Sequence, residues 1–271
     1  MCDILALATR YGGLTRGLAY AGELATAMQG SLTGLFVSEP VTTSGFQKPY
    51  PEFLTLASDV AREASDAAPT FERWAAKLGL RHHRWQVAQG RVEPVLARLA
   101  NWHDILVLES ADDIALGSAP VLGKVLLIAG ITCIVVPKGS RDAAIPESVA
   151  IAWNGAPESM RAVRSALPLL ARAKRVLLID GEGGVPYSSV AWEPSLGIER
   201  YLSEHGIAFE RRRFEASTID AGRGLLEAAR SVSANLIVMG AYGHSRFGEW
   251  VFGGATEFVL GNTEIPVLFR H

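Results

Sequence analysis

Hydrophobic positions along the chain follow two alternating patterns. Short, nearly continuous apolar runs, such as residues 4–8, 104–108 and 132–136, are typical of strands buried on both faces of a parallel sheet. Between such runs, apolar residues recur with helical spacing, as in residues 14–28. This alternation predicts an α/β chain with right-handed crossovers and helices on both faces of its sheet.

The first half of the chain is expected to hold a complete set of such elements. Its expected strands cover residues 4–8, 31–37, 81–88, 104–108 and 132–136, and its expected helices cover residues 14–28, 53–78, 92–100 and 121–129. Pro69 lies near the middle of the longest of these helices, and we expect it to kink or split that helix. A polar linker opens at Pro137 and ends near Pro146.

The same order of elements starts again after the linker. Its expected strands cover residues 149–153, 175–180, 209–215, 236–239 and 267–269, and its expected helices cover residues 159–173, 196–205 and 221–231. Residues 103–108 align with residues 234–239 in this order, so we predict a tandem duplication of a unit of about 130 residues. The two predicted domains, 1–140 and 147–271, are each a five-stranded parallel sheet with helices on both faces.

Composition narrows the class of protein. A length of 271 residues with 49% hydrophobic content is sufficient for two domains with separate cores. The net charge of −2 gives no reason to expect a nucleic-acid partner. Cys2 and Cys133 lie in different segments, which predicts neither a disulfide framework nor a zinc site. The chain shows no signal-peptide pattern and no apolar run of the about 20 residues that a bilayer requires, so we expect a cytoplasmic protein without a membrane span.

A glycine-rich stretch follows the apolar run at residues 236–239. Gly240 and Gly243 are separated by two residues, and Gly253 follows after nine more. The next residues, Gly254, Ala255 and Thr256, lead into a plausible helical turn. Glycine lets backbone N–H groups approach an anion, and a helix N-terminus adds unpaired donors and the positive end of a dipole. The stretch therefore predicts a phosphate site.

This stretch resembles the universal stress protein A family, whose nucleotide-binding members carry three glycines at this spacing, followed by Ser or Thr. Gly240, Gly243 and Gly253 match that motif, while Gly254 stands at the Ser/Thr position. The amino-acid sequence of residues 240–246 resembles that of the tandem-domain branch of the family. The resemblance implies a Rossmann-like fold of the adenine nucleotide alpha-hydrolase type. It also implies that the C-terminal domain binds ATP, with or without Mg²⁺.

The resemblance also implies which strand ends surround the nucleotide. The position of Asn154 is commonly Asp in the family; Asn lacks the charge that helps to hold a metal, and it equally suits a tight turn. Backbone groups near Ile179 and Asp180 are implied beside the adenine. The full candidate set is Ala152, Asn154, Ile179, Asp180, Met239, Gly240, Gly243, His244, Arg246, Gly253, Gly254, Ala255 and Thr256. Thr256 is expected either to replace the missing hydroxyl donor or to cap the helix, and no residue is assigned to catalysis or to a metal.

The first half departs from the motif at the same place. Glu109 stands where the second half has Gly240, and we expect its carboxylate to repel a phosphate and to block close backbone approach. We therefore interpret the first half as a structural partner that holds no nucleotide.

Three functions are compatible with these features. The first is a stress-response regulatory protein that binds ATP in its second half. The second is an interaction module of the same fold without a nucleotide, which the departures at Gly254 and Asn154 favour. The third is a slow ATPase, slow because no general base or metal-binding carboxylate accompanies the glycines. We expect the halves to pack on each other as two separate chains would, and a homodimer is a further option.

Overall fold

The computed structural model describes residues 2–39, 51–110, 119–181, 197–214, 221–241 and 253–271. Its strands are β1 (Asp3–Ala8), β2 (Ser31–Ser38), β3 (His83–Gln89), β4 (Ile105–Glu109), β5 (Thr132–Val136), β6 (Ser148–Trp153), β7 (Arg175–Gly181), β8 (Glu210–Phe214), β9 (Leu236–Gly240) and β10 (Val267–Arg270). Its helices are α1 (Arg16–Ala27), α2 (Pro51–Asp66), α3 (Ala68–Lys77), α4 (Val92–Ala100), α5 (Ala119–Ala129), α6 (Pro157–Leu170), α7 (Ile198–Glu204), α8 (Ala221–Ser231) and α9 (Gly253–Asn262). Each expected strand and helix has its counterpart here, displaced by at most a few residues at its ends.

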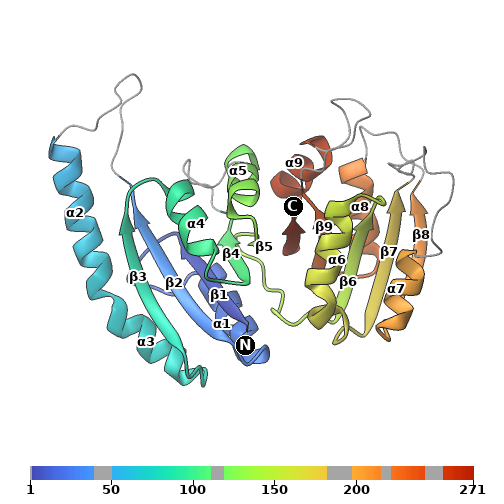
Figure 1. Cartoon of the computed structure of the whole chain (residues 1–271), viewed down its shortest axis with the longest axis horizontal. Coiled ribbons are helices and arrows are strands. Elements are labelled where there is room, and N and C mark those ends of the chain that lie inside the picture. The colour runs from blue at the N-terminus through green and yellow to red at the C-terminus, as the bar shows by residue number, and fades with distance from the viewer. Residues whose placement is uncertain (1, 40–50, 111–118, 182–196, 215–220, 242–252) are drawn as a thin grey trace.

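Pro69 divides the long expected helix as predicted. Helix α2 ends at Asp66 and α3 begins at Ala68, with Pro69 in the first turn of α3. A proline is tolerated in a first turn because the N–H that it lacks has no intrahelical partner there. The break at Ala67 produces the elbow between α2 and α3 on one side of the molecule (Figure 1).

The two repeats form one continuous sheet of ten strands. Its order is β3-β2-β1-β4-β5-β10-β9-β6-β7-β8, and the pairs within each half are parallel. The two halves meet through an antiparallel pair, β5 with β10, in which Ile134 lies opposite Leu268. Figure 1 shows the halves side by side, with α5 next to α9 above this junction. The predicted pair of five-stranded parallel units is confirmed, and their edges protect each other from other strands.

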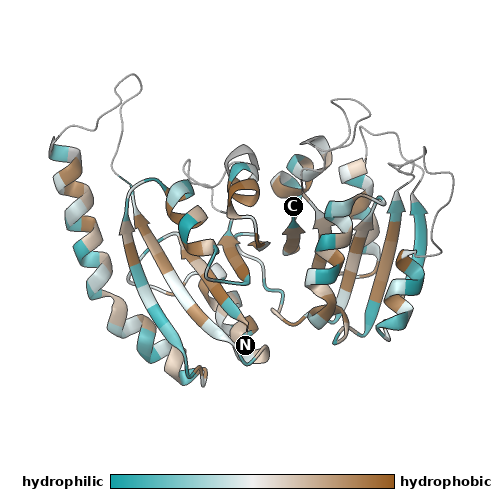
Figure 2. Ribbon diagram, viewed as in Figure 1, coloured by the Kyte–Doolittle hydropathy of each residue, from teal (hydrophilic) through white to brown (hydrophobic). Residues whose placement is uncertain are grey.

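Helices cover both faces of this sheet. Apolar residues of α1, α3, α6 and α7 pack on one face, which we call the α1–α6 face. Residues of α4, α5, α8 and α9 pack on the other, which we call the α4–α9 face. Because side chains alternate along a strand, β4 sends Val107 to the first face and Leu106 to the second. The inner strands are accordingly hydrophobic along most of their length, whereas the edge strands β3 and β8 are largely polar (Figure 2).

Polar contacts add to the junction between the halves. The Arg172 guanidinium of the second half donates to the carbonyl of Ala27, the last residue of α1, at 3.0 Å. Arg270, at the end of β10, donates to the carbonyl of Gly130, just after α5. Both arginines thus meet unpaired carbonyl groups at the ends of first-half helices, where a positive charge is favourable.

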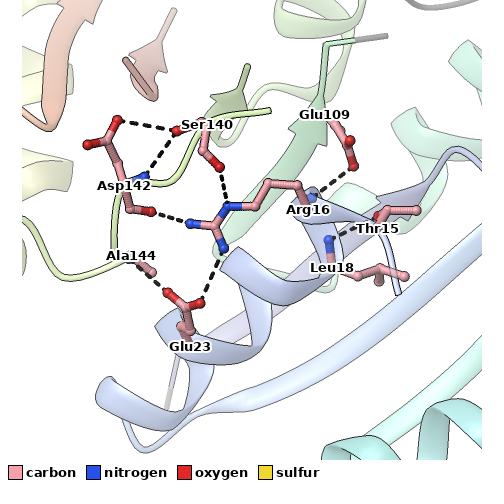
Figure 3. A network of polar contacts seen from close by, with 9 residues as sticks. Thr15, Arg16, Leu18, Glu23, Glu109, Ser140, Asp142 and Ala144 are labelled. Carbon is pink, nitrogen blue, oxygen red and sulfur yellow. Dashed lines mark hydrogen bonds and ion pairs between the residues drawn. The ribbon is translucent and has the colours of Figure 1, made fainter. Parts of the chain in front are cut away.

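Arg16 attaches the linker to α1. Its Nε donates to the Ser140 carbonyl at 2.9 Å, and its guanidinium also donates to the Asp142 carbonyl. Its Nη1 lies 3.2 Å from a carboxylate oxygen of Glu23, whose other oxygen accepts the Ala144 N–H at 3.1 Å. Figure 3 shows this network along the first two turns of α1.

Candidate functional site

Three predicted site residues lie in one row across neighbouring strands of the second half. Ala152 of β6 is in register with Ile179 of β7 on one side and with Met239 of β9 on the other. All three belong to the apolar layer on the α4–α9 face, and Ile179 and Met239 are buried. The row lies near the carboxyl ends of parallel strands, where open α/β sheets bind their ligands.

Helix α9 begins beyond the end of this row. Its first residue is Gly253, Gly254 follows and is exposed, and a Cβ built on Gly254 would meet no atom of the described residues within 4 Å. None of the described residues therefore covers Gly254 in the first turn of α9, where backbone N–H groups lack intrahelical partners. Ala255 is half-buried, and Thr256 is 2% exposed, so the Thr256 side chain is enclosed by the protein rather than directed into solvent.

The side chain of Asn154 binds the backbone at the start of α6. Its side-chain oxygen accepts the backbone N–H of Ala156 at 3.1 Å, and Gly155 between them has a φ of +76°. This is the local turn that an Asn-Gly pair favours, because Asn bonds the backbone two residues ahead and glycine tolerates positive φ. The turn interpretation of Asn154 is thus supported by a specific contact.

The Asp180 carboxylate points toward the edge of the sheet. It accepts hydrogen bonds from Nε of Arg211 on β8, at 3.1 Å, and from a second nitrogen of the same guanidinium. Arg211 also pairs with Glu199 of α7, and its pKa is raised, first by the hydrogen bond to Asp180. The carboxylate of Asp180 is therefore already paired with Arg211. Only the backbone groups of Asp180 are left to bind a ligand.

Gly240 makes a close backbone contact that sequence reasoning missed. A Cβ built on it would lie 2.6 Å from the backbone nitrogen of Ser159 and 2.7 Å from the carbonyl carbon of Glu158. Both residues belong to the first turn of α6. Glycine is therefore required here for the packing of a helix on a strand end, whether or not an anion binds nearby.

Glu158 is the functional-site neighbour that the sequence analysis did not identify. It is 7% exposed, and its carboxylate pairs with Arg161 at 3.0 Å. An acidic residue in the first turn of a helix, followed by a basic residue three positions later, was the available signal. Glu158 places a negative charge beside Gly240 on the α1–α6 face.

Three of the predicted residues, Gly243, His244 and Arg246, lie outside the residues that the structure describes. Residues 147–270 match the model of the Universal stress protein family. The second half of the chain is therefore a domain of the universal stress protein type.

Solved structures extend this likeness to both halves. A universal stress protein from Archaeoglobus fulgidus DSM 4304 is 15% identical, with coverage of 99% of this chain and 96% of that one and a TM-score of 0.68. A functionally unknown protein from Pseudomonas aeruginosa PAO1 is 14% identical, with coverage of 98% and 91% and a TM-score of 0.60. Such identities show a shared fold alone. No curated protein matches the chain in sequence.

The first half has the universal stress protein fold but a different strand end. The Glu109 carboxylate, at the end of β4, accepts the backbone N–H of Gly17 in the first turn of α1 at 2.9 Å (Figure 3). The side chain is thus turned onto α1 on the α1–α6 face. This helix start therefore already has a carboxylate of the chain itself, and the expectation that Glu109 repels a phosphate stays a prediction.

Among the described residues, no helix is both long and apolar enough to cross a membrane. Among the same residues, no group of three or more His, Cys, Asp or Glu side chains is arranged to hold a metal ion.

Proposed function

We propose that the second half, residues 147–271, binds an adenine nucleotide, with ATP as the expected ligand, and that the first half, residues 1–140, is its structural partner. The observation that carries this proposal is the row Ile179–Ala152–Met239 near the carboxyl ends of three parallel strands, together with the start of α9 at Gly253 and Gly254. The row offers small and apolar side chains to a base, and the start of α9 offers backbone donors to phosphate oxygens.

The residues present fit a nucleotide in two further respects. Asp180 has its carboxylate bound to Arg211, so it brings no uncompensated charge to the base. Gly254 has no side chain to obstruct the first turn of α9. Gly243, His244 and Arg246 remain proposed phosphate contacts on the strength of the family resemblance, and Mg²⁺, if it takes part, would rely mainly on the phosphates because Asn154 carries no charge.

Bound ATP would act as a regulatory ligand in a stress response. A ligand that binds one conformation more tightly than another shifts the population toward it, and the free-energy shift is the difference between the two affinities. The chain itself would supply binding and orientation. We expect hydrolysis to be slow, because no side chain of the described site is placed as a general base.

A second candidate, an interaction module without a nucleotide, is favoured by one specific observation. Glu158 is a buried carboxylate beside Gly240, and Thr256 is enclosed, so two groups near the strand end are already committed to the protein interior. A surface used by a protein partner would require no anion there.

Titration calorimetry with ATP, with and without Mg²⁺, distinguishes the two candidates when it is applied to a matched pair of variants. Gly254→Asp places a carboxylate at the start of α9, where the helix dipole tolerates it and an added Cβ meets no described residue within 4 Å. We expect it to fold and to bind ATP at least tenfold more weakly, by charge repulsion. Gly261→Asp, near the other end of α9 and equally open, is the control and should bind ATP as the wild type does.

Absence of ATP binding by the wild type at millimolar concentrations would remove the nucleotide proposal and leave the interaction module. Equal affinity in both variants would instead show that the ligand binds away from the start of α9.

A further inference from the structure

A cavity of about 100 Å³ lies in the first half, on the α1–α6 face and apart from the proposed nucleotide site. One wall is the loop of residues 12–14, and the other comes from the elbow and first turns of α3, with Ala67 and Thr70. Three aromatic rings complete the lining: Phe71, Trp74 and Trp85. The cavity is therefore bounded by helix, strand and loop, and most of its lining is apolar.

The loop is specific to the first half. Residues 9–14 connect β1 to the N-cap of α1, whereas Asn154 and Gly155 alone make the equivalent connection in the second half. Tyr11 fixes the longer loop against α2 and β2. Its hydroxyl donates to Glu63 at 2.8 Å, and its ring meets the Phe36 ring edge-on at 5.0 Å between centroids. Anchored in this way, the residues after Tyr11 face α3.

Two glycines make room for the aromatic wall. A Cβ on Gly34 of β2 would lie 2.8 Å from the rings of both Phe71 and Trp85, and a Cβ on Gly22 of α1 would lie 2.7 Å from the Trp74 ring. The ring centroids of Phe71 and Trp85 are 5.3 Å apart, a distance typical of favourable aromatic pairs. The absence of side chains at Gly22 and Gly34 thus leaves room for the three aromatic rings on the α1–α6 face.

The polar groups of the wall are turned away from the cavity or placed at its rim. Trp85 donates its indole N–H to the Ala64 carbonyl of α2 at 2.8 Å, so its ring offers an apolar surface. Thr70, at the rim, accepts a hydrogen bond from the Arg73 guanidinium at 3.1 Å. Arg73 does not line the cavity itself, but its guanidinium reaches the rim through Thr70. Within the described part of the chain Arg73 forms no ion pair, so its charge is available to an anion at that rim.

We propose that this cavity binds a small aromatic carboxylate. An engineered protein core with a cavity of about 150 Å³ holds one benzene ring. The cavity described here is of comparable size, so it suits a ligand with one aromatic ring rather than with fused rings. The ring would pack among Phe71, Trp74 and Trp85, and the carboxylate would meet Arg73 at the rim through a charge-assisted hydrogen bond.

Ligand-observed NMR titrations of the full chain with benzoate, and with benzyl alcohol as the neutral probe, test the proposal. We expect saturable benzoate binding with a Kd on the order of 1 mM, which a ligand of about nine non-hydrogen atoms allows. Arg73→Gln should weaken benzoate roughly threefold, as an exposed ion pair permits, and leave benzyl alcohol unchanged. Arg81→Gln is the matched control, because it is the same change at an exposed arginine that, among the described residues, neither lines the cavity nor bonds a lining residue.

Two filling variants test the location. Ala67→Phe and Gly13→Leu each enlarge a lining residue. A Cβ on Gly13 meets none of the described atoms within 4 Å, so the second variant should fold. Either one should abolish binding of both probes. The proposal is overturned if neither probe saturates with the wild type, or if both filling variants still bind benzoate. Equal affinity for the two probes, unchanged in Arg73→Gln, would overturn the assignment of a carboxylate.

Discussion

The carboxylate of Glu109 accepts the backbone N–H of Gly17 at 2.9 Å, and the second half exchanges the two residue types. Gly240 occupies the strand position equivalent to Glu109, and Glu158 occupies the helix position equivalent to Gly17, two residues after the N-cap. In both halves a glutamate therefore lies where a helix start meets a strand end. The other partner is a glycine because a second side chain would not fit between them.

Replacing Glu109 should weaken the first half. Glu109→Ala leaves the Gly17 N–H without its acceptor at a partly buried helix start, and we expect a loss of about 1–3 kcal/mol in the free energy of unfolding. Glu109→Gln keeps an acceptor and should lose less. Urea denaturation measures both values, with Glu257→Ala on the exposed side of α9 as the control. A loss no larger than that of the control would show that the Gly17 contact adds no stability.

A methyl group at Gly240 should damage the second half for reasons of packing. In Gly240→Ala the new Cβ would lie within 2.6 Å of the Ser159 nitrogen, and both are backbone-fixed, so strand β9 and helix α6 must separate. Overpacking of this kind costs about 1–3 kcal/mol. Thermal unfolding measures the loss, and Gly254→Ala, whose Cβ meets no atom within 4 Å in the described part of the chain, is the control.

This variant also separates two uses of glycine. If Gly240→Ala lowers the melting temperature but leaves ATP affinity intact, the first glycine of the motif serves the contact with α6. An unchanged melting temperature would contradict the packing account.

The order of elements was predictable because it depends on local patterns. The run of residues 132–136 and the helix over residues 92–100 have the predicted bounds, and Pro69 divides α2 from α3 as its missing N–H requires. The tandem repeat followed from the same order of elements on both sides of the linker.

Contacts between distant segments were not predictable in this way. The antiparallel pairing of β5 with β10 joins edge strands whose sequences indicate burial but not a partner or a direction. Glycine spacing is also ambiguous, because a glycine can make room either for a bound anion or for a closely packed helix. Gly240 packs closely against the first turn of α6. Side-chain contacts such as the pairing of Asp180 with Arg211 depend on the order of strands in the sheet, and a single sequence does not reveal that order.

Asp142, in the linker, should make stability depend on pH. Burial raises its pKa above the ordinary value of 3.8, although the Ser140 hydroxyl and Arg16 act in the opposite direction. An acid with a raised folded-state pKa favours the folded state while protonated, and this contribution is lost as pH rises through that pKa. At neutral pH the wild type therefore carries a cost that Asp142→Asn lacks.

The expected gain for Asp142→Asn at pH 7 is below about 1 kcal/mol, because solvent screens a group that is only half-buried. The difference should shrink as pH falls and vanish below about the ordinary pKa of 3.8. Melting temperatures of both proteins between pH 3 and pH 7 give this comparison. A less stable Asn variant at neutral pH would mean that attraction to Arg16 outweighs burial.

Tyr20 offers the sharpest test of the packing beneath the linker. The residue is fully buried, and among the described residues its hydroxyl is the buried side-chain polar atom without a hydrogen-bond partner. Burial raises the pKa of this hydroxyl, which therefore stays neutral. A buried hydroxyl without a partner costs about 1–3 kcal/mol, so Tyr20→Phe should increase the free energy of unfolding by about 1 kcal/mol. The ring, 5.6 Å from the Arg16 guanidinium, is retained in the variant.

The same substitution at Tyr11 is the matched control, because the Tyr11 hydroxyl donates to Glu63. Tyr11→Phe loses that bond and should lower stability, so the two variants are expected to move in opposite directions. Urea denaturation at neutral pH measures both. A Tyr20→Phe protein that is less stable than the wild type would show that the hydroxyl finds a partner in solution, with an ordered water between Tyr20 and the linker as the first candidate, because buried waters satisfy such groups.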